Sequence, residues 1–305
     1  MSGKKISLVV VGSIGLDTIE TPKEKRDEVL GGSVSYACAT ASLFTRTGMV
    51  GVVGQDFPKP CEALYKRLGI DLEGLQKKDG KTFRWSGVYE ENMNTRRTLS
   101  TDLNVLAEFS PELPPAYRVS PFVFLANIAP TLQLKVLSQM KKPKFVAADT
   151  MDLWINIARE PLVEVISKID LLLLNDSEAR ELTGEHHLMD AARKVLDLGP
   201  RYVIVKKGEH GSMLVSRDEV YLLPAFPVCD VKDPTGAGDS FAGAFMGYLA
   251  HKGKPSPSAV KRAMLCGTVA ASFTVEAFSL DRLGTLKRRA LDRRVREFRR
   301  MVHVA

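Results

Sequence analysis

The chain has 305 residues, of which 45% are hydrophobic and 26% are charged, and its formal net charge is +7. These proportions exclude a fibrous or largely disordered protein, and we expect one large globular domain over residues 1–305. No apolar run reaches the roughly 18 residues that a membrane-spanning helix needs, so we expect no contact with a membrane.

The N-terminal segment and the cysteines favour a cytoplasmic protein. The apolar stretch at residues 6–12 is short and is soon followed by Asp17, which is not typical of a secretory signal peptide. The four cysteines are far apart in the sequence and show no metal-ligand spacing, as expected of small hydrophobic side chains. We therefore expect a reduced protein in the cytoplasm.

Short runs of β-branched residues and leucine predict buried strands, with helix-like segments between them. In chain order these runs are ISLVVVG at 6–12, VFLANI at 123–128, KFVAADT at 144–150, DLLLLN at 170–175 and YVIVKKG at 202–208. Continuous apolar strands that alternate with helices are typical of a mostly parallel sheet with helices on both faces. The sequence therefore predicts an α/β fold, with ligands bound in the polar loops after the strands.

Residues 80–102 follow another pattern, in which polar and apolar residues alternate without a helical stripe. This alternation is typical of half-exposed antiparallel strands. We predict a small β-sheet lid formed mainly by residues 80–102, with residues 15–30 as a second contributor. Phe83, Trp85 and Tyr89 are candidates for stacking on a base or covering a sugar, and packing within the lid is the simpler interpretation.

The segment DPTGAGDSFAGAF at residues 233–245 combines a glycine-rich turn with the start of a helix. Pro234 favours an extended approach, and Gly236 and Gly238 permit a turn whose amide groups point in one direction. Apolar residues then recur at spacings of three and four from Phe241 onward, as in a helix. A glycine turn that leads into a helix N-terminus is an anion-binding site.

Asp239 stands at the far end of this turn, where a carboxylate would repel a phosphate that was only being bound. We therefore expect Asp239 to take a proton while the amides stabilise the transferring group, as phosphoryl transfer to a hydroxyl requires. The alternative is that Asp239 only caps the helix. A P-loop and a dehydrogenase are disfavoured, because the chain contains no G-x-x-x-x-G-K-[ST] segment and Phe241 replaces the third glycine of a dinucleotide fingerprint.

The C-terminal segment carries the positive charge of the chain. Residues 282–300 contain nine basic and two acidic side chains, which accounts for the whole net charge of +7. Leu291, Val295, Phe298 and Val302 recur at helical spacing, so the segment predicts an amphipathic helix with a basic face. We favour a solvated face and expect no nucleic-acid partner; contact with an anionic partner is the alternative.

Taken together, these segments resemble the ribokinase-like (PfkB) family of carbohydrate and nucleoside kinases, whose C-terminal signature is similar to DPTGAGDSFAGAF. Four further segments support the resemblance in the same order along the chain: VGSIGLD, GGSVSYACATAS, VGVVGQDFPKP and NDSEARELTG. The resemblance spans residues 6–280. It implies a ribokinase-like fold and an ATP-dependent phosphotransferase that moves the γ-phosphate of ATP to a hydroxyl of a small sugar-type acceptor.

The resemblance assigns roles to two motifs. Asp239 is then the general base. The anion hole for the γ-phosphate is formed by the backbone amides of Gly236, Ala237 and Gly238. Asn175 and Glu178 match an N-x-x-E motif that organises Mg²⁺ through water near the nucleotide, and an ordinary acid in the first turn of a helix is the alternative for Glu178.

Further matches concern the two substrates. The residues that match nucleotide contacts are Lys206, Gly208, Gly211 and Thr235; for Lys206, an exposed lysine at a strand end is the alternative. Asp17 matches the aspartate that binds sugar hydroxyls, which suits a carboxylate that can accept two hydrogen bonds. Gly31 and Gly32 match a glycine pair that lets the acceptor approach the backbone, and Tyr36 follows them on the acceptor side.

Two positions depart from the ribokinase pattern. Many members of the family have an asparagine where this chain has Tyr36, and ribokinases tend to have an asparagine where it has Gly15. Both asparagines contact hydroxyls, so their absence argues against ribose and favours a larger or more aromatic acceptor.

Three interpretations of function therefore stay open. A kinase for a sugar or sugar derivative is the first, and a ribonucleoside kinase of the same fold is the alternative. A non-catalytic regulatory protein that binds nucleotide or sugar is the alternative from another class, which the intact Asp239 and Glu178 oppose. Family members often form dimers through their lid sheets, and the lid segment of this chain is long enough to do so.

Overall fold

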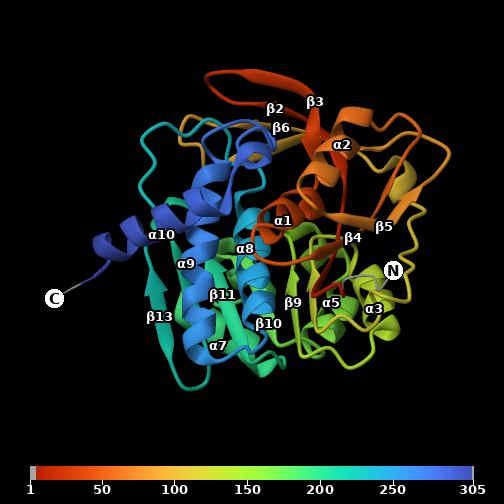
Figure 1. The fold of residues 1–305 in the computed structure, drawn as a ribbon. Helices are drawn as coiled ribbons and strands as arrows, with labels where there is room; N and C mark the ends of the chain where they lie inside the picture. The colour runs from red at the N-terminus through yellow and green to blue at the C-terminus, as the bar shows by residue number, and fades with distance from the viewer. Residues whose placement is uncertain (1–4, 304–305) are drawn as a thin grey trace.

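The structure is a computed structural model that describes residues 5–303. Within this range nine strands form one sheet: β1 (Leu8–Val11), β4 (Thr47–Val53), β5 (Asp71–Lys77), β8 (Phe122–Leu125), β9 (Phe145–Asp149), β10 (Leu171–Asn175), β11 (Tyr202–Lys206), β12 (Ser212–Val215) and β13 (Val220–Leu223). Their order is β13-β12-β11-β10-β9-β8-β1-β4-β5, and all neighbours are parallel except β11–β12 and β12–β13 (Figure 1). The predicted α/β sheet is confirmed.

Helices cover both faces of this sheet. One face packs against α1 (Ser33–Ala41), α2 (Lys59–Arg67), α8 (Ala237–Lys252), α9 (Pro257–Thr274) and α10 (Arg288–Met301). The other packs against α3 (Pro130–Gln139), α4 (Asp152–Ile157), α5 (Arg159–Ile166), α6 (Asp176–Thr183) and α7 (Leu188–Asp197). Successive leucines of β10 point alternately into the two cores, so this strand is buried on both sides and its sequence is a continuous apolar run.

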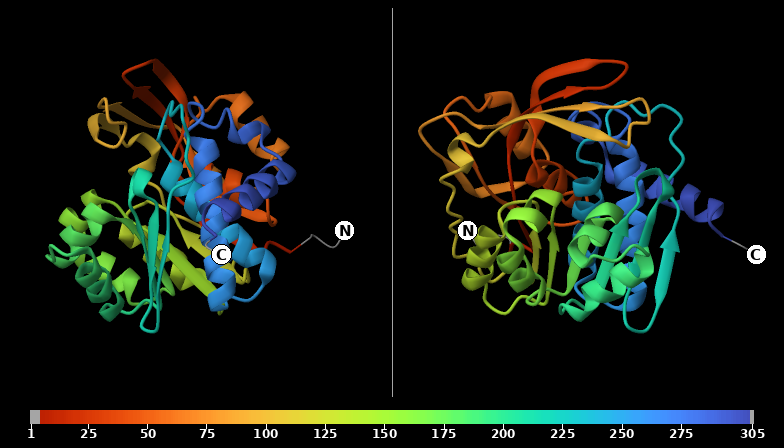
Figure 2. Two further views of the ribbon diagram at one scale, coloured as in Figure 1. Left: turned by 90° about the vertical axis from the view of Figure 1, so that its left-hand side faces the viewer. Right: turned by 180° about the vertical axis from the view of Figure 1, so that it is seen from behind.

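A second sheet of four strands lies above the body of the molecule (Figures 1 and 2). Its strands, in spatial order, are β3 (Lys25–Gly31), β2 (Gly15–Glu20), β6 (Phe83–Tyr89) and β7 (Arg96–Asp102). β2 pairs with β3 and β6 with β7 in antiparallel fashion, whereas β2 and β6 are parallel. We call these four strands the small sheet. Three short 3-10 turns complete the described elements: η1 (Asn104–Leu106), η2 (Gly208–His210) and η3 (Leu283–Thr285).

Polar contacts hold the small sheet against the body. Lys23, between β2 and β3, forms an ion pair with Asp230 at 2.8 Å. The Thr235 hydroxyl donates a hydrogen bond to the Tyr89 hydroxyl at 3.1 Å. Between β6 and β7, the Asn94 amide donates to Glu209 Oε1 at 2.8 Å. The small sheet is therefore fixed to two loops of the body, the one between β13 and α8 and the one that contains η2.

Some strands were not predicted, and β4 shows why. Its sequence, TGMVGVV, is interrupted by Gly48 and Gly51, which weaken a strand pattern. A Cβ atom at Gly48 would lie 2.6 Å from the Tyr117 ring, and one at Gly51 would lie 2.8 Å from the Ile14 side chain. The glycines are present because large side chains pack directly on the backbone of this strand. Separately, no helix within residues 5–303 is long and apolar enough to span a membrane.

Candidate active site

The carboxyl ends of three adjacent strands face the start of α8. Asp149, Asn175 and Lys206 are the last residues of β9, β10 and β11. Parallel strands end at one edge of their sheet, and open α/β sheets bind ligands there. This edge and the turn before α8 bring together most of the residues that the sequence singles out, although they are distant along the chain.

The glycine turn has the geometry of an anion site. Gly236 is the N-cap of α8 and adopts a left-handed backbone with φ 74°. Within the described part of the chain, no hydrogen bond uses the backbone N–H of Gly236 or Gly238, whereas Ala237 N donates to Pro234 O at 3.2 Å. Of the three amides predicted for the anion hole, those of Gly236 and Gly238 are therefore the available donors, and the Ala237 amide is already engaged within the turn.

Asp239 lies in the first turn of α8 beside this anion site. Burial, and next the nearby Asp149, raise its pKa to about 6, against the opposing effects of Lys206 and Arg96. The positive end of the helix dipole also favours the ionised form. A carboxylate with this pKa is ionised at neutral pH and still basic enough to accept a proton, which suits a general base.

Lys206 lies under the same turn, paired with a carboxylate that the sequence analysis did not single out. Its ammonium group is 2.7 Å from Asp149 Oδ2 and 3.0 Å from Oδ1. Burial lowers the pKa of Lys206, and Asp149 and Glu178 raise it by more, so the side chain stays charged. A Cβ atom on Gly238 would lie 3.2 Å from Lys206 Nζ, which places the ammonium group next to the anion site. The lysine is held in place, as the resemblance implies, and is not a loose surface residue.

Asn175 and Glu178 bind each other's backbone at the start of α6. Glu178 N donates to Asn175 Oδ1, and Asn175 N donates to Glu178 Oε2, both at 2.7 Å. This is a capping box. Burial raises the pKa of Glu178 to about 7, against the opposing effect of Lys206. Glu178 thus lies in the first turn of a helix, as its alternative interpretation expects. The Oε1 atom of its carboxylate has no hydrogen bond among the described residues.

Asp17 forms the opposite side of the site, on β2 of the small sheet. It is 4% exposed, and its Oδ1 atom is buried without a hydrogen-bond partner in the described structure. Burial raises the pKa of Asp17 to about 7, with Asp233 adding to the increase. A Cβ atom on Gly31 would lie only 1.8 Å from Asp17 Oδ2, so a glycine is required beside this carboxylate. The second glycine of the pair, Gly32, is left-handed with φ 89°.

The two departures from the ribokinase pattern have structural counterparts. Tyr36 is 1% exposed, and its ring lies 2.4 Å from where a Cβ atom of Gly236 would be, so it supports the underside of the glycine turn. We predicted Tyr36 as an acceptor contact; its ring packs against the turn, and its hydroxyl is buried without a hydrogen-bond partner among the described residues. At Gly15, a Cβ atom would lie 2.7 Å from the Phe83 ring. An aromatic ring of β6 thus occupies the space beside Asp17 that a side chain at position 15 would need.

The remaining predicted nucleotide contacts lie near the edge of the small sheet. Gly208 and Gly211 flank η2 with φ 54° and φ 86°. A Cβ atom on Gly208 would lie 3.1 Å from Asn94 Oδ1, and one on Gly211 would lie 2.1 Å from Leu223 O. Thr235 N donates to Asp233 Oδ1 at 2.9 Å, which shapes the turn. These positions line the side of the site where η2, the glycine turn and the β6–β7 loop converge.

The small sheet also contributes a cation that sequence reasoning missed. Arg96 is the first residue of β7 and pairs in register with Tyr89. Its guanidinium lies 5.4 Å from the centre of the Trp85 ring. It is near enough to lower the pKa of both Asp17 and Asp239. No local pattern marks this residue, because it is one of two adjacent arginines in an exposed strand, and its role appears only once the position of the small sheet is known.

Comparison with known proteins decides the family. Residues 5–280 match the pfkB family carbohydrate kinases. The chain belongs to this family. It is 31% identical over 264 residues to a cytidine kinase of Thermococcus kodakarensis, covering 84% of this chain and 92% of that protein. It is 25% identical over 293 residues to a nucleoside kinase of Methanocaldococcus jannaschii, covering 91% and 93%.

Solved structures show that this pfkB kinase has the ribokinase fold. The crystal structure of the Methanocaldococcus jannaschii nucleoside kinase matches with a TM-score of 0.76 and 22% identity, covering 97% of this chain and all of that one. A ribokinase of Giardia lamblia matches with a TM-score of 0.81 and 19% identity over similar shares. The predicted family, fold and enzyme class are confirmed: the protein is an ATP-using kinase that transfers the γ-phosphate to a hydroxyl of a sugar-type acceptor.

The raised pKa of Asp17 predicts a cost in stability. A carboxyl group whose pKa is 3.8 when unfolded and about 7 when folded loses stabilising protonation as pH rises, so the free energy of unfolding should fall between pH 5 and pH 8. Asp17→Asn should remove part of this fall and raise the free energy of unfolding at pH 8, on the order of a few kcal/mol. Urea unfolding at both pH values measures it, with exposed Asp190→Asn as control. Equal pH dependence in Asp17→Asn and wild type would contradict the prediction.

Proposed function

We propose that the protein is an ATP-dependent nucleoside kinase. The observation that carries this proposal is the position of Phe83, whose ring packs over Gly15 next to the buried carboxylate of Asp17, whose Oδ1 atom has no hydrogen-bond partner among the described residues. A carboxylate can hold the hydroxyls of a ribose, and an aromatic ring beside it offers a face for a base. A free sugar would use the carboxylate and leave the ring without a partner.

The relatives support a nucleoside acceptor over the simple sugar that the sequence placed first. Both similar proteins that span most of the chain are named for nucleosides, a cytidine kinase and a nucleoside kinase. A simple sugar stays the second candidate, because the carboxylate of Asp17 beside Gly31 would bind the hydroxyls of either acceptor.

The described residues suit phosphoryl transfer to a hydroxyl. We assign Asp239 as the base that takes the acceptor proton, and the amides of Gly236 and Gly238 as donors to the γ-phosphoryl oxygens. Lys206, held by Asp149 next to this turn, offsets the negative charge that gathers on those oxygens.

A magnesium ion fits the carboxylate of Glu178. Within residues 5–303 no group of three or more acidic, histidine or cysteine side chains could hold a metal ion. Mg²⁺ in kinases is usually held by one or two protein oxygens together with water and substrate phosphates. When bound, the ion neutralises phosphate charge; Glu178, with Asn175 fixing its position, would hold it through water.

We assign the small sheet as a lid. Its polar contacts with two loops of the body close the site from above, and closure excludes water, which is itself an acceptor of phosphate. Arg96 lies on the inner side of this lid, and we assign it to the charge that develops on the transferred group. Pairing of two chains through the lid and a cytoplasmic location stay predictions; all seven residues of β7 are exposed and available for such pairing.

An acceptor panel tests the proposed function. Release of ADP should be measured with cytidine, uridine, inosine, adenosine and guanosine, and with ribose and fructose, each at several concentrations. We expect a nucleoside to have the highest kcat/KM. Phe83→Ala should lower kcat/KM for that nucleoside roughly tenfold or more and leave ribose nearly unchanged, because a stacked base is lost. A free sugar ahead of every nucleoside would overturn the proposal, and ATP binding without turnover would support the non-catalytic alternative.

Loss of the base should separate catalysis from binding. Asp239→Asn should lower kcat by roughly 10²-fold or more while ATP binding is retained, because only the proton acceptor is removed. Asp190→Asn, the same change at the third position of α7, is the matched control. In the wild type, kcat/KM should fall as pH drops through about 6, since the Asp239 carboxyl must be ionised to act. Near-normal turnover in Asp239→Asn would remove it from this role.

Arg96→Met should lower kcat by roughly 10-fold to 100-fold, because a cation aimed at the transferring group is lost. It should also move the acid limb of the pH profile upward, since Arg96 lowers the pKa of Asp17 and Asp239. Arg97→Met is the matched control, because successive strand residues face opposite sides of a sheet. Equal effects of the two substitutions on kcat and on the pH profile would refute the assignment.

A further inference from the structure

The inner side of α10 is fully used in fixing this helix to the body. Leu291 and Phe298 are buried in the core. The Arg294 guanidinium lies 3.5 Å from the centre of the Phe273 ring and forms an ion pair with Glu276 at 2.7 Å. Arg288 lies 4.4 Å from the centre of the Phe44 ring and pairs with Asp292 at 2.8 Å. These contacts account for two of the arginines of α10 and for one of its two acids.

The outer side of α10 carries arginines that hold nothing in the body. They are all exposed, and we call them the arginine face: Arg289, Arg293, Arg296, Arg299 and Arg300. Within residues 5–303 none of them is within 4.0 Å of a carboxylate. Four of them are spaced by four, three and four residues, so they form one row about 16 Å long at a rise of 1.5 Å per residue. Glu297 is the one acid of α10 left without an ion pair in the described residues.

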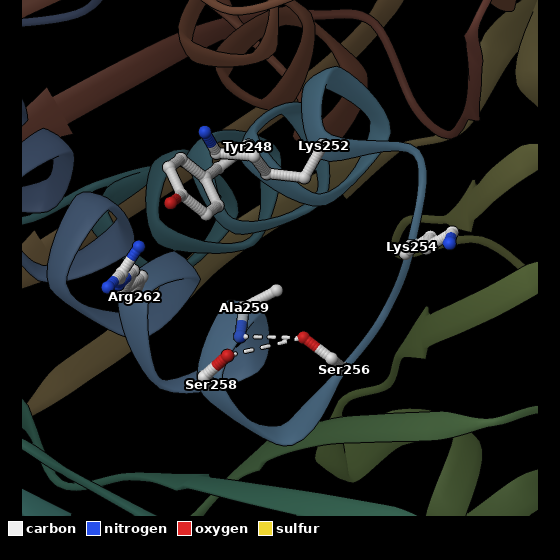
Figure 3. A pocket seen from close by; sticks show the side chains of 7 residues that line it. All are labelled: Tyr248, Lys252, Lys254, Ser256, Ser258, Ala259 and Arg262. Atoms are coloured by element: carbon white, nitrogen blue, oxygen red, sulfur yellow. Dashed lines mark hydrogen bonds between the residues drawn. The ribbon is translucent and has the colours of Figure 1, made fainter.

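A further group of exposed cations lies at the turn between α8 and α9. There, a hollow of about 250 Å³ is lined by three cations and no acid: Tyr248, Lys252, Lys254, Ser256, Ser258, Ala259 and Arg262 (Figure 3). Lys252 lies 5.6 Å from the centre of the Tyr248 ring, and Tyr248 packs edge-on against Phe44, which in turn contacts Arg288 of α10. Contacts through the buried Phe44 ring therefore link this hollow to Arg288, on the inner side of α10.

A purely solvated face explains this pattern poorly. Like charges three and four residues apart destabilise a helix, and interleaved glutamates would have relieved the repulsion while keeping the helix soluble. The exposed cations of α10 are all arginines, whose planar guanidinium binds phosphate through two hydrogen bonds. The end of α10 also projects from the body, away from the small sheet, so a large partner can approach it (Figures 1 and 2).

The chemistry of the surface narrows the class of partner. A helix that lies on a membrane inserts an apolar face, but the apolar face of α10 is buried in the core. Proteins that bind single strands stack bases on aromatic side chains, and the arginine face contains none. A row of arginines on a fixed helix suits the phosphates of a duplex, read without base contacts.

We propose that the arginine face and the adjoining hollow bind the phosphodiester backbone of duplex nucleic acid, without sequence preference. The site is separate from the kinase site, because α10 and the α8–α9 turn contribute no residue to it. Binding should therefore leave phosphoryl transfer unchanged, and the proposal stands whatever the acceptor of the kinase is.

The test is a salt titration of binding to a short fluorescent RNA duplex and a DNA duplex of the same sequence, followed by anisotropy. The variant Arg293→Gln, Arg296→Gln, Arg300→Gln should bind roughly tenfold or more weakly at moderate salt. Its slope of log K against log salt should be smaller by about 3, since three phosphate contacts are lost. Its kinase activity should equal that of the wild type, which shows that it is folded.

A matched control removes the same charge elsewhere. Lys141, Lys142 and Lys144 are exposed at the turn after α3, and their change to glutamine should leave duplex binding unchanged. Equal loss in the two triple variants would reduce the effect to net charge and overturn the proposal. No salt-dependent binding by the wild type would overturn it as well. If polyglutamate competes as well as the duplex at equal charge, the partner of the face is an acidic protein, and the proposal is overturned. If the wild type binds phosphatidylserine vesicles and no duplex, and the arginine variant loses the vesicle binding, the face contacts a membrane, which overturns the proposal as well.

Discussion

The contact between α1 and the start of α8 is the constraint on which the site depends. Gly243 brings the two helices so close that a Cβ atom there would lie 2.1 Å from Ala37 O. The Thr40 hydroxyl donates to Ser240 O at 3.0 Å in the same contact. With α8 fixed in this way, the Tyr36 ring supports Gly236 from below, and the turn presents its amides and Asp239 to the sheet edge. The anion site and the base therefore depend on helix packing in the core as much as on the residues of the motif.

The site gathers acidic groups that the folded chain does not neutralise by itself. Burial raises the pKa of Asp17, Glu178 and Asp239 well into or near the physiological range. Each of them lies where the assigned function places a hydroxyl, a hydrated cation or a proton in transfer. On the proposed function, the substrates would supply the polar partners that these groups lack among the described residues, and this would account for a stable fold that keeps such costly groups. Lys206 and Arg96 are the protein's own positive counterparts.

The sequence predicted those parts of the molecule whose signal is local. Continuous apolar runs marked β1, β8, β9, β10 and β11, because these strands are buried on both faces. The glycine turn and Asp239 could be found because a phosphate-binding turn needs its residues next to one another in the chain. By contrast, Gly48 and Gly51 hid β4, because the side chains that require them come from distant segments. Asp149 had a weak signal as a polar end to a predicted strand, and Arg96 had none, because its role depends on where the small sheet lies.

Two of the groups that we assign to the reaction, Asp17 and Arg96, lie on the small sheet. Asp17 lies on β2 of this sheet, whereas Asp239 lies on α8 of the body. Any movement that lifts the sheet also carries the acceptor carboxylate and Arg96 away from the base and the anion site. If the small sheet is the lid that we propose, an open molecule would hold nucleotide beside an incomplete set of groups. Because Asp17 and Arg96 belong to the same sheet, opening the site to water would also withdraw two groups that the proposed reaction needs.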